Sequence, residues 1–538
     1  MIKGKNTYAV YIGLCVALLP VLLLRDFTPD NELRYLSIAD EALRNNTFFT
    51  FTNHGVPYAD KPPLYLWFVM LGKWLFGSHQ MWFLSLFSLV PALVTVHVMD
   101  RWTGRSLNSE GHATARLMLL TCALFVGMAV TLRMDMLMCM FIVLALRSFF
   151  RLYSAQPENA RTAAFGVAGG MAGAAVSAEA AAREKWLFPI YVFMAVFSKG
   201  PIGILVPLLA PTVFLIYKRR LRQFGRYWGW RTWAILIVLC AGWFGAVYAE
   251  GGNEYLDNLL FHQTLDRAVN AFHHERPFYF YAISVWYSIA PWSLAVIGLI
   301  VAAACKKLIT TDLQQFFVTI MLTTFVMLSC ISSKVHIYLL PAFPFMVYTG
   351  MMFMPAFSRT KWLKLTIAIP SAAIAASLPA LAVITNGKDT SWLGLPAFYA
   401  AAAILSASGI YAIISLYGKR GGADKAVRTI AVGMLAAVFA GGWALPQVKE
   451  QIGYGALCEK ALEVSQATGT TDFCTWNIKR SENMDVYLHR DVEIIPKEET
   501  PKAEAGRTKV LMTRTRDAST FKGCKTYTVG KYAVIVLK

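Results

Sequence analysis

Long runs of apolar residues, separated by short polar segments, dominate residues 1–450 of this 538-residue chain. A helix rises about 1.5 Å per residue, so about 20 apolar residues cross the hydrocarbon core of a membrane. The first run, Tyr8 to Leu24, is long for a signal peptide and is not followed by an A-x-A-like cleavage site, so we interpret it as a membrane helix. The pattern predicts thirteen spans, at 7–24, 80–99, 113–131, 135–153, 185–198, 201–217, 231–249, 279–304, 314–331, 336–354, 362–384, 394–417 and 426–444.

The pattern changes at about residue 451, where the apolar content drops and short alternating runs appear. Alternation with a period of two is typical of strands. We expect strands near 472–476, 492–495, 509–512, 527–529 and 532–537, and an amphipathic helix over 456–466. The sequence therefore predicts a polytopic α-helical membrane domain, 1–450, and a small C-terminal α/β domain, 451–538, which is long enough to bury its own core.

Composition supports this division, because 56% of the residues are hydrophobic and only 15% are charged. The net charge of +19 does not indicate nucleic-acid binding, since the basic residues gather in short loops between apolar runs. Such loops face the cytoplasm, and the strongest basic cluster spans residues 218–226. The Ala- and Gly-rich stretch 166–182 is then a half-span or a cytoplasmic helix, because a full crossing would place that cluster outside.

With this orientation, the loops 25–79 and 250–278, several tight turns and the C-terminal domain face outward. Three of the nine cysteines, Cys458, Cys474 and Cys524, lie in that domain, where an oxidising compartment would permit a disulfide among them. The remaining cysteines lie in or beside apolar runs. The chain has no CxxC or Cys/His spacing typical of a zinc site.

The outward segments carry both signs of charge close to the membrane, where ionisable groups are costly and their default interpretation is functional. The alternatives without a functional role are charged side chains that snorkel to the membrane surface and ion pairs that hold loops together. The charged and aromatic positions concerned are Asp30, Glu32, Arg34, Asp40, Asp60, Lys61, Arg133, Asp135, Lys199, His262, Arg267, His273, His274, Lys334 and Tyr338.

These residue types suit the chemistry of a lipid phosphate. Lys61, Lys199, Arg267 and Lys334 suit an anion. Asp60 with His262 suits a divalent cation that neutralises a phosphate leaving group. Asp30, Glu32 and Asp135 suit a base or acceptors for sugar hydroxyls.

An ordered set of motifs over residues 25–350 resembles the aminoarabinose transferase branch of the C-fold glycosyltransferases, which are related to the protein O-mannosyltransferases. The motifs are Pro29-Asp30-Asn31-Glu32-Leu33-Arg34-Tyr35, Tyr58-Ala59-Asp60-Lys61-Pro62-Pro63, Leu132-Arg133-Met134-Asp135, Ser198-Lys199-Gly200-Pro201, Arg267 with Pro277-Phe278-Tyr279, and Lys334-Val335-His336-Ile337-Tyr338. The family transfers a sugar from a polyprenyl phosphate to an acceptor at the periplasmic face, and in the aminoarabinose branch that acceptor is a lipid A phosphate.

The resemblance implies specific roles. Asp30 resembles the catalytic carboxylate of the first loop, and Asp135 a second acid of the site. Asp60 and His262 match metal-binding positions. The carrier phosphate would contact Lys61, Arg267 and Tyr338, and we add Arg34, Lys199 and Lys334 to the predicted binding residues.

Three departures from the family pattern leave alternatives open. The spacing from Asp30 to Arg34 is one residue longer than usual, so Asn31 or Glu32 also fits the acidic position. Asp60 replaces a glutamate. His273 and His274 compete with His262 as the imidazole ligand.

We therefore expect an inverting membrane glycosyltransferase in a bacterial inner membrane. Its donor is expected to be an undecaprenyl-phosphate-linked sugar such as 4-amino-4-deoxy-L-arabinose, and its acceptor lipid A, another glycan or a protein. The alternatives are a protein O-mannosyltransferase and a non-enzymatic lipid-linked sugar transporter or flippase. Nearly charge-free spans and the lack of a convincing internal repeat argue against transport.

Overall fold

The computed structural model describes residues 5–156, 178–260, 275–387, 390–419, 421–502 and 508–537. The chain forms two compact units, each with its own internal contacts. The helical unit comprises residues 1–18, 59–65 and 85–440, and the mixed unit comprises residues 19–58, 66–84 and 441–538. The mixed unit thus joins most of the first long loop with the C-terminal segment. The predicted domain boundary at 450/451 stays a prediction.

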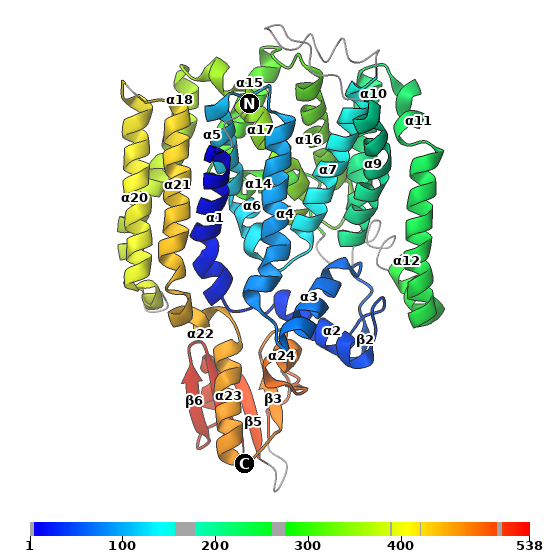
Figure 1. Cartoon of the computed structure of the whole chain (residues 1–538). Coiled ribbons are helices and arrows are strands. Elements are labelled where there is room, and N and C mark those ends of the chain that lie inside the picture. The colour runs from blue at the N-terminus through cyan, green and yellow to red at the C-terminus, as the bar shows by residue number, and fades with distance from the viewer. Residues whose placement is uncertain are drawn as a thin grey trace. The chain divides into compact units, whose positions relative to one another are not determined.

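Helices of the first half of the chain include both long spans and short connecting pieces (Figure 1). They are α1 (Lys5–Leu24), α2 (Glu32–Asn45), α3 (Leu64–Phe76), α4 (Met81–Trp102), α5 (Ser109–Leu120), α6 (Ala123–Val130), α7 (Asp135–Ser154), α9 (Ala178–Lys199), α10 (Ile202–Tyr217), η1 (Leu221–Gln223), α11 (Phe224–Tyr227) and α12 (Trp230–Asp257).

The second half continues this arrangement. Its helices are α14 (Phe280–Ser288), α15 (Ser293–Cys305), α16 (Asp312–Cys330), η3 (His336–Ala342), α17 (Phe343–Phe357), α18 (Lys361–Ala375), α19 (Ser377–Ile384), η4 (Ser391–Leu393), α20 (Pro396–Tyr417), α21 (Ala423–Gly442), η5 (Leu445–Val448), α22 (Lys449–Ile452), α23 (Gly455–Thr468), η6 (Ser481–Met484), α24 (Asp485–Leu488) and η7 (Thr515–Thr520).

Within the described residues, eight helices are long and apolar enough to cross a membrane, and two bent helix pairs bring this number to ten. The chain is thus a multi-pass membrane protein. The segments α1, α3 and α10 are shorter apolar helices by the same measure. The predicted total of thirteen spans stays a prediction, and most of the stretch 166–182 lies outside the described residues.

Two predicted spans contain sharp bends. The span expected at 113–131 is α5 followed by α6 at 67°, and the one expected at 279–304 is α14 followed by α15 at 119°. The two breaks contact each other, since Ala123 N donates to Ala290 O at 2.9 Å and Trp292 Nε1 donates to Thr121 Oγ1 at 3.0 Å. Each break thus supplies a partner for a polar group of the other, as irregular backbone at membrane depth requires.

The mixed unit contains a two-stranded hairpin and a five-stranded sheet. The hairpin pairs β1 (Thr52–Asn53) with β2 (Val56–Pro57). The sheet has the order β4-β3-β5-β7-β6, in which β3 is parallel to β4 and β5, and β7 is antiparallel to β5 and β6. Its strands are β3 (Phe473–Trp476), β4 (Glu493–Ile495), β5 (Lys509–Arg514), β6 (Lys525–Val529) and β7 (Tyr532–Leu537), so every strand predicted from alternation is present.

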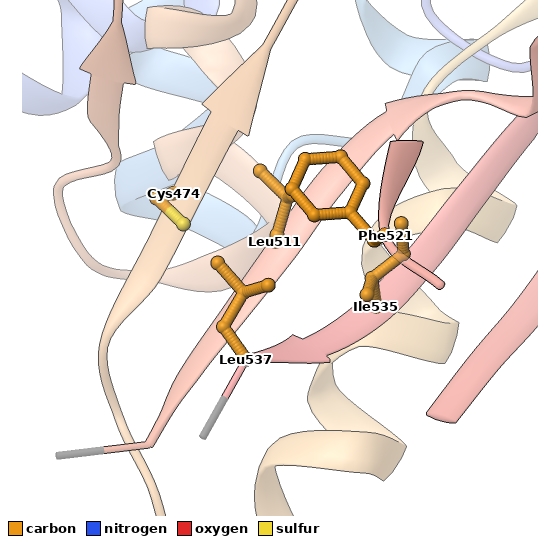
Figure 2. Packing of buried hydrophobic residues seen from close by; sticks show 5 residues of the cluster. All are labelled: Cys474, Leu511, Phe521, Ile535 and Leu537. Atoms are coloured by element: carbon orange, nitrogen blue, oxygen red, sulfur yellow. The ribbon is translucent and has the colours of Figure 1, made fainter. Parts of the chain in front are cut away.

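Apolar side chains of this sheet gather in one buried cluster of Cys474, Leu511, Phe521, Ile535 and Leu537 (Figure 2). The predicted helix over 456–466 is α23, which contacts β5 and β7. All nine cysteines, including Cys458, Cys474 and Cys524, are free thiols in the structure, so no disulfide joins the last three. Burial raises the pKa of the Cys474 thiol to about 12.

Candidate functional site

The helical unit brings together four of the segments that the sequence analysis placed in outward loops and turns. The first is residues 59–65, which lead into α3. Lys61 Nζ lies 3.1 Å from Asp60 Oδ2, and both side chains are largely buried. Pro62 and Pro63 follow directly and fix the backbone as it enters the helix.

The second and third segments meet where α7 begins and α9 ends. Asp135 is the first residue of α7 and is fully buried, a position where a negative side chain is favoured by the helix dipole. Arg133 Nε donates to its Oδ2 at 3.0 Å, and Lys199 Nζ forms an ion pair with its Oδ1. Lys199 is the last residue of α9, which ends there because Gly200 takes a φ of +98°, a conformation that residues with a side chain rarely adopt.

The fourth segment is the turn before α17. Lys199 Nζ lies 4.5 Å from the ring centroid of Tyr338, within the range of a cation–π contact. The charges of Arg133 and Asp135 both act on the ring of His336, and the charge of Lys61 acts on Lys199. We call the group Lys61, Arg133, Asp135, Lys199 and Tyr338 the cationic cluster.

Lys334 takes a different position. Its Nζ donates to the backbone oxygen of Arg276 at 3.1 Å, and a β-bridge joins Glu275 to Ser333 beside it. The side chain therefore ties the end of the loop 250–278 to the turn before α17.

The first-loop acids of the mixed unit lie in contrasting surroundings. Asp30 is exposed and lies 3.2 Å from Lys479 Nζ. Glu32 is fully buried, and its two oxygens accept hydrogen bonds from Arg25 at 2.6 and 2.8 Å. Thr28 N also donates to Glu32 at 2.7 Å, so this carboxylate fastens the start of α2.

Arg34 lies on the same helix. Its Nη2 donates to Asn31 Oδ1 at 3.0 Å, and its guanidinium lies 5.4 Å from the ring centroid of Tyr58. Asp40 forms a second buried polar group with His79 at 2.8 Å and Lys73 at 3.4 Å. Burial raises the pKa of Asp40, but His79 and Lys73 lower it by more, so the net pKa lies below its usual range.

Two predicted site residues, Arg267 and His262, lie outside the described residues, as do the competing His273 and His274. The predicted metal pair therefore contributes only Asp60 to the described part of the chain. Its carboxylate has the donor chemistry of a divalent-cation ligand, but no group of three such side chains occurs among the described residues. The metal site stays a prediction.

The predicted binding and catalytic residues did not include Arg133, which the structure places on the buried carboxylate of Asp135. The signal was available in the sequence, because Arg133 precedes the first acidic residue of a predicted span by two positions. The predicted set also gave His79 no role, and the structure pairs it with Asp40.

Three comparisons show which known proteins this chain resembles. Residues 60–182 match the model of the family described as dolichyl-phosphate-mannose-protein mannosyltransferase. Two proteins named undecaprenyl phosphate-alpha-4-amino-4-deoxy-L-arabinose arabinosyl transferase are similar. The one from Shewanella sediminis is 22% identical over 68% of this chain, and the one from Yersinia pestis is 23% identical over 56%. The alignments span only 63% and 50% of those relatives' own lengths.

A structural comparison covers far more of the molecule. The crystal structure of ArnT from Cupriavidus metallidurans bound to undecaprenyl phosphate matches 100% of this chain and 98% of its own, with a TM-score of 0.73 and 17% identity. The chain has the ArnT fold. The same enzyme in the apo state gives a TM-score of 0.72 over 99% of this chain. The resemblance inferred from the sequence, to aminoarabinose transferase-like and protein O-mannosyltransferase-like proteins, is confirmed.

Proposed function

We propose that this chain is a membrane glycosyltransferase that moves a sugar from a polyprenyl-phosphate donor to an acceptor at the periplasmic face of a bacterial inner membrane. The favoured sugar is 4-amino-4-deoxy-L-arabinose, and the favoured acceptor is lipid A. The names of the relatives support this choice, as does the undecaprenyl phosphate in the matched ArnT crystal structure. The C-terminal α/β segment is proposed to face the periplasm.

The observation that carries the proposal is the cationic cluster. Arg133 and Lys199 pair with the buried Asp135, and the charge of Lys61, from a third segment, acts on Lys199. Cations collected at membrane depth are costly unless they serve a charged partner. The phosphate of a membrane-borne donor is a partner of the right charge, and pre-placed cations stabilise the charge that such a leaving group develops.

The proposed reaction is a single displacement at the anomeric carbon. An acceptor oxygen forms the new bond while the bond from that carbon to the phosphate oxygen breaks, and the electron pair leaves with the polyprenyl phosphate. The configuration of the anomeric carbon is therefore inverted. A phosphate acceptor is already ionised and attacks without losing a proton, whereas a hydroxyl acceptor must give its proton to a base.

The exposed Asp30 is the proposed base for a hydroxyl acceptor, with Glu32 and Asp135 as the other candidates named from the sequence. Both oxygens of Glu32 accept hydrogen bonds from Arg25, which favours a structural role for this carboxylate. Arg267, Lys334, Arg34 and Tyr338 stay proposed contacts of the substrate. A divalent cation on Asp60 and His262, if bound, would neutralise charge on the leaving phosphate.

Protein O-glycosylation is the second candidate function. The family model that matches residues 60–182 carries the description of a protein mannosyltransferase, and these residues include Asp60, Lys61, Arg133 and Asp135. This alternative changes the acceptor and keeps the lipid-phosphate donor.

The test is release of free polyprenyl phosphate from a labelled undecaprenyl-phosphate sugar by the purified full-length chain. We expect release that depends on lipid A, and a loss of about 100-fold in Lys61→Ala, because removing one donor that stabilises developing negative charge typically costs about 2.7–4 kcal/mol. Lys306→Ala, at an exposed lysine after α15, is the matched control and should retain full activity.

If polyprenyl phosphate is released with a peptide acceptor and not with lipid A, the acceptor is protein and not lipid A. No release with any acceptor, from protein that binds the donor, would overturn the proposed enzyme. Lys61→Ala at parental activity would remove the phosphate site from the proposal.

A further inference from the structure

Asp135 is surrounded by cations on both sides. Arg133 Nε occupies one carboxylate oxygen at 3.0 Å, and Lys199 Nζ occupies the other. The carboxylate is fully buried, and the side chain of Lys199 is 4% exposed. Each oxygen therefore already accepts from a cation, which is an arrangement for holding cations in place. A general base needs an oxygen directed at the proton that it removes.

Asp135 lies between two cations that repel each other. Arg133 and Lys199 each pair with one of its oxygens, so the carboxylate offsets their repulsion and holds both groups beside it. Two cations held in fixed positions suit a phosphate group, because each can donate to a different phosphate oxygen.

The geometry also indicates where such an anion would bind. The ammonium group of Lys199 lies over the ring of Tyr338, so aromatic carbon covers one side of the cation and Asp135 holds another. The charge of Lys61 acts on the same ammonium group from the segment 59–65. Two of the cations thus share Asp135, and the third interacts with Lys199, although the three come from separate places in the sequence.

We propose that Asp135 is a positioning residue, which holds Lys199 and Arg133 side by side as a two-cation cradle for a phosphate group of a substrate. The proposal rests on the proposed function and deepens it, because it adds Arg133 to the binding residues and moves Asp135 out of the group of candidate bases. The phosphate belongs either to the polyprenyl donor or to a phosphorylated acceptor. The chemistry is shared, and the experiment separates the two sources.

The experiment combines binding with kinetics. Undecaprenyl phosphate is titrated into the full-length protein in detergent, and KM and kcat are measured for the donor and for lipid A. In Asp135→Asn the two cations lose the carboxylate that holds them in position, so we expect phosphate affinity to fall by about 10-fold or more, because a site that is no longer pre-organised binds more weakly. The loss should appear in KM more than in kcat.

A double variant distinguishes positioning from base catalysis. If Asp135 acts by holding Lys199, then Asp135→Asn should cost much less in a Lys199→Gln background than in the parent. If Asp135 is a base, the two losses should multiply and kcat alone should fall. Asp135→Glu, which keeps the negative charge, should recover part of the affinity and serves as the second variant if Asp135→Asn does not fold.

The chain offers a matched control on the same two helices. Glu184 on α9 is also buried and pairs with Arg151 on α7, far from the cationic cluster. Glu184→Gln therefore removes another ion pair of a buried carboxylate between α7 and α9, and should leave phosphate affinity unchanged. An equal loss of affinity in Glu184→Gln would show a general effect on the fold and overturn the proposal.

The outcomes separate this proposal from the proposed function. Weaker binding of undecaprenyl phosphate in Asp135→Asn assigns the cradle to the donor, and an increase in KM for lipid A alone assigns it to the acceptor. Unchanged binding and unchanged KM values with a fall in kcat would overturn the cradle while the glycosyltransferase survives. Binding of undecaprenyl phosphate needs no turnover, so the cradle is tested even if the chain transfers no sugar.

Discussion

The two ends of one helix pair, α7 and α9, are both joined by a buried carboxylate, yet the two junctions differ in charge. At one end Glu184 accepts a hydrogen bond from Ser148 Oγ at 2.6 Å and forms an ion pair with Arg151. At the other end Asp135 pairs with two cations, Arg133 and Lys199. Figure 1 shows the two helices running side by side between these junctions.

The difference separates a structural ion pair from a candidate binding site. Glu184 joins one ion pair to one hydroxyl donor, and so fixes one helix against another. Asp135 pairs with a different cation at each oxygen, and so holds two cations next to each other. Asp135 lies about 24 Å from Arg151 along α7, at 1.5 Å per residue, so each junction can be altered with little effect on the other.

The largest expected effect comes from removing one cation at each junction, Lys199 at one and Arg151 at the other. Lys199→Met should reduce sugar transfer by about 100- to 1,000-fold, because it removes a buried cation from the proposed phosphate cradle. Arg151→Met should lower the melting temperature but keep kcat/KM, per folded protein, within about 2-fold of the parent. Initial rates and thermal unfolding in detergent measure both. Similar transfer rates for the two variants would contradict the claim that only the Asp135 junction takes part in substrate binding.

Glu32 sharpens the comparison, because it resembles Glu184 more than Asp135. It forms a buried ion pair with Arg25, so we expect Glu32→Gln to reduce the free energy of unfolding by about 3 kcal/mol, as breaking a buried pair typically does. Transfer activity should persist below the new melting temperature. Lys479→Ala, which breaks the exposed pair with Asp30, is the control and should leave the melting temperature unchanged. Loss of activity in folded Glu32→Gln would indicate that Glu32 has a catalytic role.

The smallest expected effect is a pH-dependent difference between two acids of the mixed unit. Burial raises the pKa of Asp485, and His54 and Ser37 only partly offset this effect. The pKa of Asp40, in contrast, lies below its ordinary value of 3.8, because His79 and Lys73 outweigh its burial. Charged partners thus determine the sign of the shift, as they do for the two junctions of α7 and α9.

The two shifts predict opposite stability changes. A lowered pKa contributes stability above the unfolded value, which is lost as the pH falls through the folded pKa, so Asp40→Asn should be the less stable protein at pH 7. A raised pKa contributes stability below the unfolded value, which is lost as the pH rises through the folded pKa, so Asp485→Asn should be the more stable at pH 7. Shifts of about 2–4 °C per kcal/mol are expected in thermal unfolding, and both differences should shrink below about pH 3.8. Shifts of the same sign at pH 7 would contradict the assignment.

Sequence patterns predicted the local elements well, because each depends on residues that are neighbours along the chain. Apolar runs identified α4, α7, α12, α16, α20 and α21, and alternation identified all five strands of the sheet. The bends within two predicted spans were missed, since a bend depends on contacts such as Trp292 with Thr121, which are far apart in sequence. The sequence left a disulfide among Cys458, Cys474 and Cys524 possible, and all three are free thiols in the structure.

What the sequence determined by itself was the class of protein and the list of chemically active residues. The length and charge of an apolar run decide whether it can enter a membrane, and ionisable residues beside such runs stand out because burial makes them costly. The tertiary structure alone decided which of them act together. Asp135, Lys199 and Tyr338 are distant in sequence, and their pairing depends on how α7, α9 and η3 pack. Packing likewise brought Lys199 to Asp135, and the position of Asp135 in the chain did not reveal this pairing.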